Sequence, residues 1–471
     1  MLNASWNRAG PSINDKIYDY STQLVGVRES LYPALRTRFM SRIDLRRAFK
    51  QLFRALSQMY LLATKVGEFV FIDATMSMGL RNTCKLFEED FMKAFVKGLI
   101  HHHPELFSDR FGALVNNYLD DIWFLADTAE KNTLQVLVAE FWARWLGIQL
   151  NEQKREVPCS NTRHLGFMID LKLKVVKITA KHKGKILVFF DRLLLSVRKK
   201  GRILIKDIQK LLGLQIWISS VFRVARQFLT SFCDILKAAH GRYTYFYPSK
   251  YPLLVTRAIS DLQFWRRLVS CSASMSFDYL LNRLPENNII LASDACTSFG
   301  MAGVLRFQQT NQSYKDFDGL FWQMTWEEWQ KIAAIDDLLP GNVKINVAEF
   351  LALLITIETF AEFCKSKMST LELDNITAKA WFDAARCPNF PFDRCAQGTH
   401  LFMMECAMKI VTVWISSSAN VLADTPSRKR LSNKGTGINV AGFQLLKVKP
   451  RWKNVIKFYK TGRHADKRST K

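Results

Sequence analysis

Apolar and polar residues follow different periods in successive parts of the chain, and these periods predict its secondary structure. From Arg42 to about Asp170, short apolar runs alternate with longer stretches of helical spacing, as in an α+β domain. Apolar residues recur at helical spacing in Cys84–Leu99 and in Ala129–Trp145, which predicts two helices. Two strand-like runs, Ala113–Val115 and Ile122–Leu125, flank a short polar connection and predict a β-hairpin.

The pattern changes beyond this first domain. Lys172–Lys210 is rich in lysine and arginine, and it leads into the helical segment Ile205–Ala239. A third region starts with the apolar strand Ile289–Ala292 and continues with an amphipathic helix, Val347–Phe363, and a strand that ends near Asp374.

The composition indicates a folded protein with a polyanionic partner. The chain has 471 residues, of which 48% are hydrophobic, so several folded domains are expected and disorder is excluded for the bulk of it. A formal net charge of +25 indicates nucleic acid as the partner. We find no secretory signal, no apolar run long enough to span a bilayer and no acylation signal. No membrane partner is therefore expected, and we predict an intracellular protein, in the cytoplasm or the nucleus.

The cysteines and histidines do not define a metal site. Nine cysteines are scattered without a C-x-x-C pair, and we expect all of them to be reduced thiols. Cys387 and Cys395 flank a proline-containing loop, but no second pair or histidine cluster completes a zinc site. The run His101–His103 could bind a metal, although a solvated loop before Pro104 is the favoured interpretation.

Two adjacent aspartates stand at the tip of the predicted hairpin, in the tetrapeptide Tyr118-Leu119-Asp120-Asp121. Like charges repel at such a tip, and the pair is tolerated best where a divalent cation neutralises it; a short acidic surface turn is the alternative. The blocks that surround the pair are, in chain order, Ser41–Phe49 with Asp44, the glycine turn Met76–Leu80, Leu146–Asn151 with Lys154, and His164–Phe167.

A second set of four acids lies in the last region. Each follows or opens an apolar element, so all could converge at one end of a sheet: Asp294, Glu349, Asp374 and Asp424. A single acid at the end of an element is ordinarily a cap, and Asp424 before Pro426 would make a good one. Four acids in this order, with Asn375 and Ser427-Arg428 beside them, are harder to explain as capping.

In this order, the blocks around Asp120 resemble the palm motifs of reverse transcriptases, and the later acids resemble the quartet of RNase H. The resemblance is closest to retroelements of the DIRS type, which carry a tyrosine recombinase; Ser12–Asp15 and Cys84–Glu88 add to it. It implies an α+β multidomain fold, with a right-hand polymerase palm, truncated fingers and a helical thumb, followed by an α/β RNase H-like domain. The expected domains are partial fingers and palm at 1–170, a basic helical thumb at 171–245, a connection at 246–286, the RNase H-like domain at 287–432 and a basic C-terminal tail at 433–471.

The resemblance also implies a role for the palm residues. Asp44, Asp120 and Asp121, with the carbonyl of Leu45, would hold two Mg²⁺ ions, or Mn²⁺ in their place, for transfer of a nucleotide onto a primer. The residues expected to contact the incoming dNTP are Leu45, Arg47, Ala48, Phe49, Gly79, Tyr118 and Lys154.

Some of these residues have a second interpretation. Phe49 would be the steric gate that excludes a ribose 2′-hydroxyl, and a core aromatic is the alternative. Lys154 would protonate the departing pyrophosphate, or it is a solvated lysine. Arg47 and Ala48 would offer backbone amides to the triphosphate, and Gly79 would let the templating base pair approach the backbone.

The four later acids would likewise hold two Mg²⁺ ions, here for hydrolysis of the RNA strand of an RNA–DNA hybrid. One residue departs from the pattern. Where many relatives carry a histidine ahead of the last aspartate, this chain has Trp414. Because that histidine is thought to help proton transfer or product release, we expect a slower nuclease and not an inactive one.

The leading hypothesis is therefore a retrotransposon reverse transcriptase, an RNA-directed DNA polymerase with ribonuclease H. The alternative is a decayed or co-opted element remnant that binds nucleic acid without polymerising, because the upstream fingers strands are expected to be missing. The expected partners are an RNA template, a DNA primer, an RNA–DNA hybrid and dNTPs. An element-encoded recombinase or capsid protein is a further candidate partner.

Overall fold

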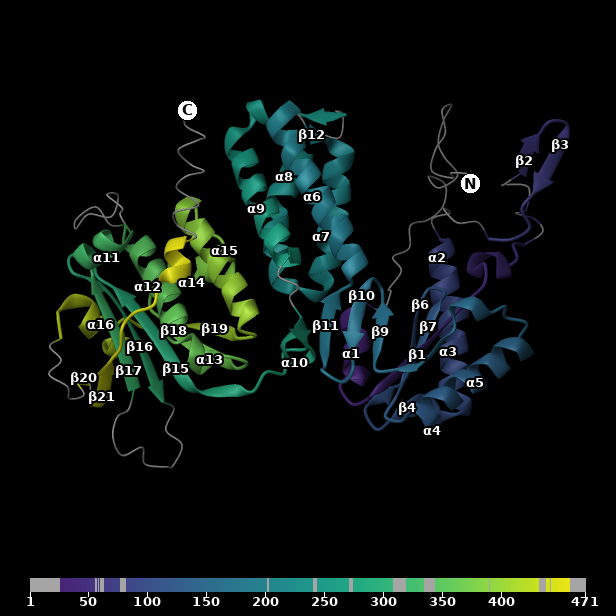
Figure 1. The fold of residues 1–471 in the computed structure, drawn as a ribbon, viewed down its shortest axis with the longest axis horizontal. Helices are drawn as coiled ribbons and strands as arrows, with labels where there is room; N and C mark the ends of the chain where they lie inside the picture. The colour runs from purple at the N-terminus through teal and green to yellow at the C-terminus, as the bar shows by residue number, and fades with distance from the viewer. Residues whose placement is uncertain are drawn as a thin grey trace. The chain divides into compact units, whose positions relative to one another are not determined.

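The computed structural model describes residues 26–55, 57, 59, 63–76, 82–200, 203–239, 244–270, 274–307, 319–333, 344–388, 390–431, 438–440 and 442–457. Gly79 and the block Ser12–Asp15 lie outside these residues. The chain divides into two compact units, Met1–Thr179 and Ala180–Lys471, and each is described by itself (Figure 1).

The main sheet of the first unit has four antiparallel strands in the order β6-β7-β1-β8. Their bounds are Phe39–Asp44 for β1, Val115–Tyr118 for β6, Asp121–Ala126 for β7 and Glu156–Cys159 for β8. Strands β6 and β7 form the predicted hairpin: Tyr118 pairs with Asp121, so only Leu119 and Asp120 remain at the tip. Because β1 pairs with β7, Asp44 lies directly opposite Asp121.

Helices of this unit share one hydrophobic core with the sheet. A continuous helical segment comprises α2 (Thr83–Lys85), the π-helix η4 (Leu86–Met92) and α3 (Lys93–His102). It packs with α5 (Ala129–Trp145) against strand residues such as Ile43 and Phe124 (Figure 1). Both predicted helices are thus confirmed, and α5 has the predicted bounds.

The histidine run is solvent-exposed at His101 and His102, as predicted, but these two residues end a helix and do not lie in a loop. His101 and His102 are the last residues of α3, and His103 follows as its C-terminal cap. The His102 ring stacks on Trp142 at 5.0 Å between centroids, and Trp142 Nε1 donates to His103 Nε2 at 3.1 Å. An aromatic partner on α5 therefore holds the run against the helix pair.

Short elements complete the first unit. They are α1 (Val27–Ala34), η2 (Ala48–Gln51), β2 (Ala63–Val66), β3 (Phe69–Ile72), α4 (Pro104–Phe107), β4 (Ser108–Asp109), β5 (Gly112–Ala113), η5 (Glu152–Lys154), β9 (Asn161–His164), β10 (Phe167–Asp170) and β11 (Val175–Ile178). Strands β2 and β3 form a separate hairpin, and β9, β10 and β11 are antiparallel neighbours.

The second unit begins with a group of helices. They are α6 (Ala180–Lys200), α7 (Ile205–Val221), η6 (Arg223–Leu229), α8 (Thr230–Ala238) and α9 (Pro252–Ser270), with β12 (Ile203–Leu204), β13 (Tyr245–Phe246) and η7 (Pro248–Lys250) between them. Helix α9 falls in the expected connection, and it packs against α6 and α8 within this group of helices (Figure 1). The short elements β14 (Met275–Ser276) and α10 (Phe277–Leu280) follow.

A seven-stranded sheet forms the rest of this unit, in the order β19-β18-β15-β16-β17-β21-β20. The bounds are β15 Glu286–Ala295, β16 Gly300–Phe307, β17 Gly319–Thr325, β18 Met368–Leu373, β19 Lys409–Trp414, β20 Ile438–Val440 and β21 Phe443–Lys447. The first three in sequence are antiparallel, whereas β18 is parallel to β15 and β19 is parallel to β18. The helices are α11 (Trp326–Ala333), α12 (Ile345–Thr359), α13 (Ala361–Cys364), α14 (Ile376–Asp383), α15 (Phe390–Glu405) and α16 (Val421–Arg428).

Helices cover both faces of this sheet. Helix α12 is buried on all sides and packs with Leu291 of β15, whereas α16 packs with the next residue, Ala292, which points to the opposite face. Gly303 of β16 lets α12 approach closely, because a Cβ there would lie 2.0 Å from Thr356 Oγ1. The chain is therefore an α+β protein, and its second unit ends in an α/β domain built on the seven-stranded sheet.

Part of the expected basic tail belongs to this domain. Strands β20 and β21 extend its sheet, and Val455 is buried in its core. Strand β21 pairs with distant β17, and β20 pairs with β21, which basic composition does not reveal. Among the residues that the structure describes, no helix combines the length and the apolar character needed to cross a bilayer.

Candidate active sites

The hairpin tip and the end of β1 bring the three palm aspartates to one edge of the sheet. Asp44 is 3% exposed at the end of β1, opposite Asp121 at the start of β7. Asp120 occupies the tip, where its carbonyl accepts a hydrogen bond from the backbone N–H of Leu45 at 3.0 Å. Backbone pairing therefore holds the three aspartates close together, as predicted. The distances between their main chains depend little on side-chain conformation.

The environment of Asp120 and Asp121 opposes the ionisation of their carboxyl groups. Burial, and to a smaller extent the charges of Asp120 and Asp44, raise the pKa of Asp121 to about 6, although the Arg42 guanidinium at 3.6 Å opposes the shift. Burial, and then the charge of Asp44, also raises the pKa of Asp120. A divalent cation would remove this repulsion, and carboxylate oxygens are the hard ligands that Mg²⁺ prefers.

Lys154 is an ion-pair partner of a palm aspartate. Its Nζ lies 2.9 Å from Asp44 Oδ2, and Asn151 Nδ2 donates to the other oxygen at 3.2 Å. The hydrogen bond to Asp44 raises the pKa of Lys154. The Lys154 side chain is 57% exposed as well as ion-paired, so it is a solvated lysine, and its role as a proton donor stays a prediction.

The residues after Asp44 lie in a short turn. Leu45 is buried, and Arg47 has a left-handed backbone with φ of 50° at the start of η2. Phe49 is 8% exposed, and its ring packs against Phe87 at 4.9 Å between centroids. The structure thus places Phe49 as a core aromatic, buried like its neighbour Ala48, and its role as a steric gate stays a prediction.

Glu88 is a functional candidate that the sequence analysis missed. It is fully buried on η4, and its Oε2 accepts hydrogen bonds from Asn117 Nδ2 at 2.9 Å and from the backbone N–H of Leu119 at 2.8 Å. Leu119 has a φ of 52°, a conformation that costs a residue with a Cβ about 1–3 kcal/mol. Glu88 therefore supports the strained tip that carries Asp120. The sequence shows Glu88, Glu89 and Asp90 in a row, with no sign of which one is buried.

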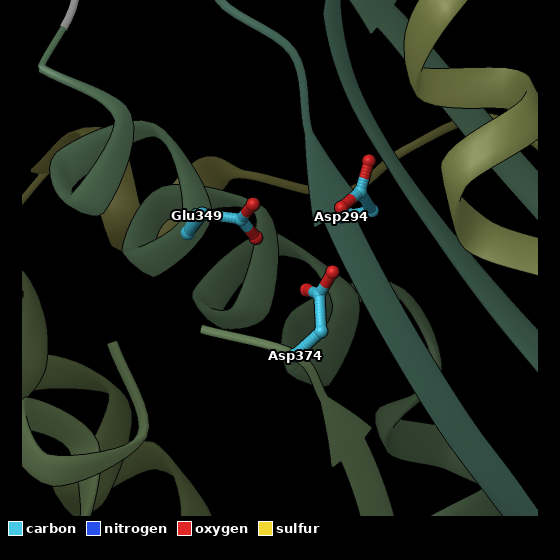
Figure 2. A group of neighbouring side chains, drawn as sticks. All are labelled: Asp294, Glu349 and Asp374. Atoms are coloured by element: carbon cyan, nitrogen blue, oxygen red, sulfur yellow. The ribbon is translucent and has the colours of Figure 1, made fainter. Parts of the chain in front are cut away.

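Three of the four RNase H acids converge. Their ligand oxygens, from Asp294, Glu349 and Asp374, all lie within 4.8 Å of one another, and no other group of three His, Cys, Asp or Glu side chains in the described part of the chain is as close. Figure 2 shows the carboxylates pointing toward one another from β15, from α12 and from the residue after β18. The sheet and the helix on its face thus assemble a compact acidic site.

Burial and mutual repulsion shift the pKa values of this site upward. Burial and then the charges of Asp294 and Asp374 raise the pKa of Glu349 to about 9. Burial raises the pKa of Asp294 to about 6, although a hydrogen bond from the Ser427 hydroxyl opposes the shift. Without a cation the site therefore retains a proton at neutral pH, and a divalent cation would displace it.

The fourth acid, Asp424, does not join this group. It lies in the first turn of α16, where its Oδ1 accepts a hydrogen bond from Arg428 Nε at 2.6 Å, and the cap of the helix is Asn420 instead. The spacing of four residues on one helix brings Asp424 and Arg428 together. Asp424 is still close enough for its charge to raise the pKa of Asp294.

Two further residues orient Asp374. Trp414 is 50% exposed, and its Nε1 donates to the backbone carbonyl of Asp374 at 3.0 Å. Asn420, which the sequence analysis missed, donates from Nδ2 to the Ser293 carbonyl at 3.2 Å and to Asp374 Oδ1 at 3.4 Å. Trp414 is thus beside the acidic site.

The chain resembles solved structures from foamy virus. No protein-family model and no curated protein matches it. A foamy viral protease-reverse transcriptase in complex with RNA/DNA hybrid is 13% identical, with a TM-score of 0.40, over 91% of this chain and 50% of that chain. A second structure, in complex with dsDNA, is 14% identical with a TM-score of 0.39, over 86% of this chain and 73% of that chain. The chain therefore spans about half the length of the first of these proteins.

Proposed function

We propose that this chain is an RNA-directed DNA polymerase that also hydrolyses the RNA strand of RNA–DNA hybrids. One observation carries the proposal: acidic side chains gather both at the β6–β7 hairpin and beside the seven-stranded sheet, where Asp294, Glu349 and Asp374 converge. The net charge of +25 fits a partner with a phosphate backbone. An origin in a DIRS-type retrotransposon rests on the sequence blocks alone.

At the nuclease site, Asp294, Glu349 and Asp374 are the residues that would hold divalent cations. When bound, such ions supply an activated water and stabilise the leaving 3′-oxygen. The Ser427 hydroxyl and the Asn420 amide hold the carboxylates of Asp294 and Asp374 in place, so little reorganisation is needed. Asp424 would reach the same ions only after leaving Arg428.

At the palm site, Asp44, Asp120 and Asp121 would hold the cations that activate a primer hydroxyl and support the departing pyrophosphate. In the absence of a cation, the ion pairs of Asp44 with Lys154 and of Asp121 with Arg42 offset part of the negative charge of these carboxylates. Cation binding would compete with the first of these pairs. The chain's own contribution is a rigid main-chain frame, since β1 and β7 hold Asp44 opposite Asp121.

The second candidate is a nucleic-acid-binding remnant that does not polymerise. The engagement of Asp44 by Lys154 favours it, because an ion-paired aspartate is less available to a metal. Primer extension on an RNA template with Mg²⁺ distinguishes the two, with Asp120→Asn as the matched variant. The proposal requires extension by the natural chain and its loss in the variant. Equal extension by both, or hybrid binding without extension, would refute the polymerase assignment.

A further inference from the structure

Helix α5 carries an apolar stripe on its solvent-facing side. Leu134, Leu137, Phe141 and Trp145 are 46%, 49%, 65% and 70% exposed. They recur at spacings of three and four residues, which is the heptad period of helices that pack along their length. The residues of α5 that face the palm core are different ones: Asn132, Gln135, Val136, Ala139 and Ala143. A contiguous stripe of this kind marks an interaction surface, whereas isolated exposed apolar residues do not.

A groove adjoins the C-terminal end of the stripe. Its volume is about 430 Å³, and Phe91, His102, Trp142, Trp145 and Leu146 contribute to its lining. Its walls belong to η4, α3 and α5, all within the first unit. The rings of His102 and Trp142, which both line the groove, stack on each other. The apolar surface therefore widens beside Trp145, which gives a packing partner more than a single helix to contact.

Charges at the two ends of the stripe complement each other. Glu130 stands near one end and Arg144 near the other, each seven residues from Leu137 and so about 10 Å from it along the helix. Neither makes an ion pair among the residues that the structure describes. Two copies of α5 packed antiparallel about Leu137 would place each Glu130 against the Arg144 of the other copy, and Leu134 against Phe141. Parallel packing would instead place like charges together.

We propose that the chain forms a homodimer through antiparallel packing of α5 on the α5 of a second copy, with the two-fold axis at Leu137. A two-fold interface must be self-complementary, and this stripe meets that condition at Leu134, Leu137 and Phe141 and in its charges, whereas Trp145 would lie opposite Ala129 at the edge of the interface. An unrelated partner would not need opposite charges at equal distances from a central leucine. The inference does not depend on the proposed function, because none of these residues belongs to either acidic site.

Sedimentation of the full chain over a wide concentration range tests the dimer. The natural chain is expected to be dimeric at micromolar concentration, and Leu137→Glu, which sets two carboxylates at the axis, should weaken dimerisation at least about 100-fold. Leu173→Glu is the matched control, since Leu173 is 63% exposed elsewhere in the same unit. Circular dichroism on each variant shows whether the fold is retained.

Charge reversal tests the register. Glu130→Arg and Arg144→Glu should each weaken the dimer, and the double variant should regain most of the lost affinity, because its ion pairs are re-formed in the opposite sense. A natural chain that is monomeric at every concentration overturns the proposal. That is the result expected if another part of the chain, or a different partner, covers the stripe. So does a dimer that Leu137→Glu leaves unchanged, or a double variant no tighter than the single ones.

Discussion

Removing the Glu88 carboxylate should impair the polymerase site and spare the nuclease site. Glu88→Ala leaves the Asn117 amide and the Leu119 N–H without their acceptor beneath the hairpin. Each of these lost hydrogen bonds costs about 1–3 kcal/mol when a buried donor is left unpaired, so the combined cost is about 2–6 kcal/mol. That exceeds the strain of about 1–3 kcal/mol stored at Leu119, and the tip should relax.

The assay is single-turnover primer extension. A displacement of about 1 Å at Asp120 should slow the chemical step about 100-fold, with little change in primer–template affinity. Glu88→Gln keeps one acceptor oxygen and should lie between Glu88→Ala and the natural chain. Asp90→Ala is the control, because Asp90 is exposed two residues away.

Two results would refute this reasoning. Extension by Glu88→Ala at the natural rate would mean that the carboxylate does not hold the tip. An equal loss of hybrid cleavage would mean that the substitution unfolds the protein generally and does not act on the palm hairpin.

The remaining predictions concern buried charge. Arg386 Nη2 lies 2.9 Å from Asp261, which is fully buried, so Arg386→Met should lower the free energy of unfolding of the second unit by about 3–5 kcal/mol. Adding Asp261→Asn should restore much of it, and hydrogen exchange of α9 and α15 in the full chain measures both; unchanged exchange in the single variant would contradict the argument. Burial lowers the pKa of His164 to about 3 from its ordinary 6.5, so the unfolded chain binds more protons between these values and stability should fall as pH drops below 6.5, by up to about 1.4 kcal/mol per pH unit. Denaturation midpoints at pH 7 and pH 5 should show this dependence, and His164→Gln should lack it. Because the pKa of Glu349 is raised to about 9, Mg²⁺ binding to the nuclease site should release a proton at pH 7 and tighten as pH rises toward 9. Calorimetry in two buffers of different ionisation enthalpy would detect the proton, and identical heats would contradict it.

The local spacing of apolar residues was sufficient to predict the helices and strands in which that spacing is regular. Helix α5 has the bounds that the apolar spacing predicts, and β6 and β7 form the hairpin that two apolar runs indicate. The order of the acids likewise identified residues that the fold brings together, because each of Asp294, Glu349 and Asp374 sits on or directly after an apolar element.

Features that depend on tertiary contacts were not predictable. Nothing in the local sequence distinguishes Glu88 from Glu89. They differ in a tertiary contact, because it is Glu88 that accepts the hydrogen bond from Leu119 of the hairpin. Strands β20 and β21 exist because β17 offers them a partner from far away in the sequence. The pairing of Asp424 with Arg428 is the exception, because its spacing of four residues on one helix is visible in the sequence.

The most direct test of the account is single-turnover cleavage of a labelled RNA–DNA hybrid in Mg²⁺. The compact group of Asp294, Glu349 and Asp374 predicts that the natural chain cuts the RNA strand and that Asp294→Asn abolishes the cut while hybrid binding persists. Asp120→Asn, at the other acidic site, should cleave at the natural rate. Cleavage that survives Asp294→Asn, or that Asp120→Asn removes, would contradict the assignment of two separate metal-dependent sites.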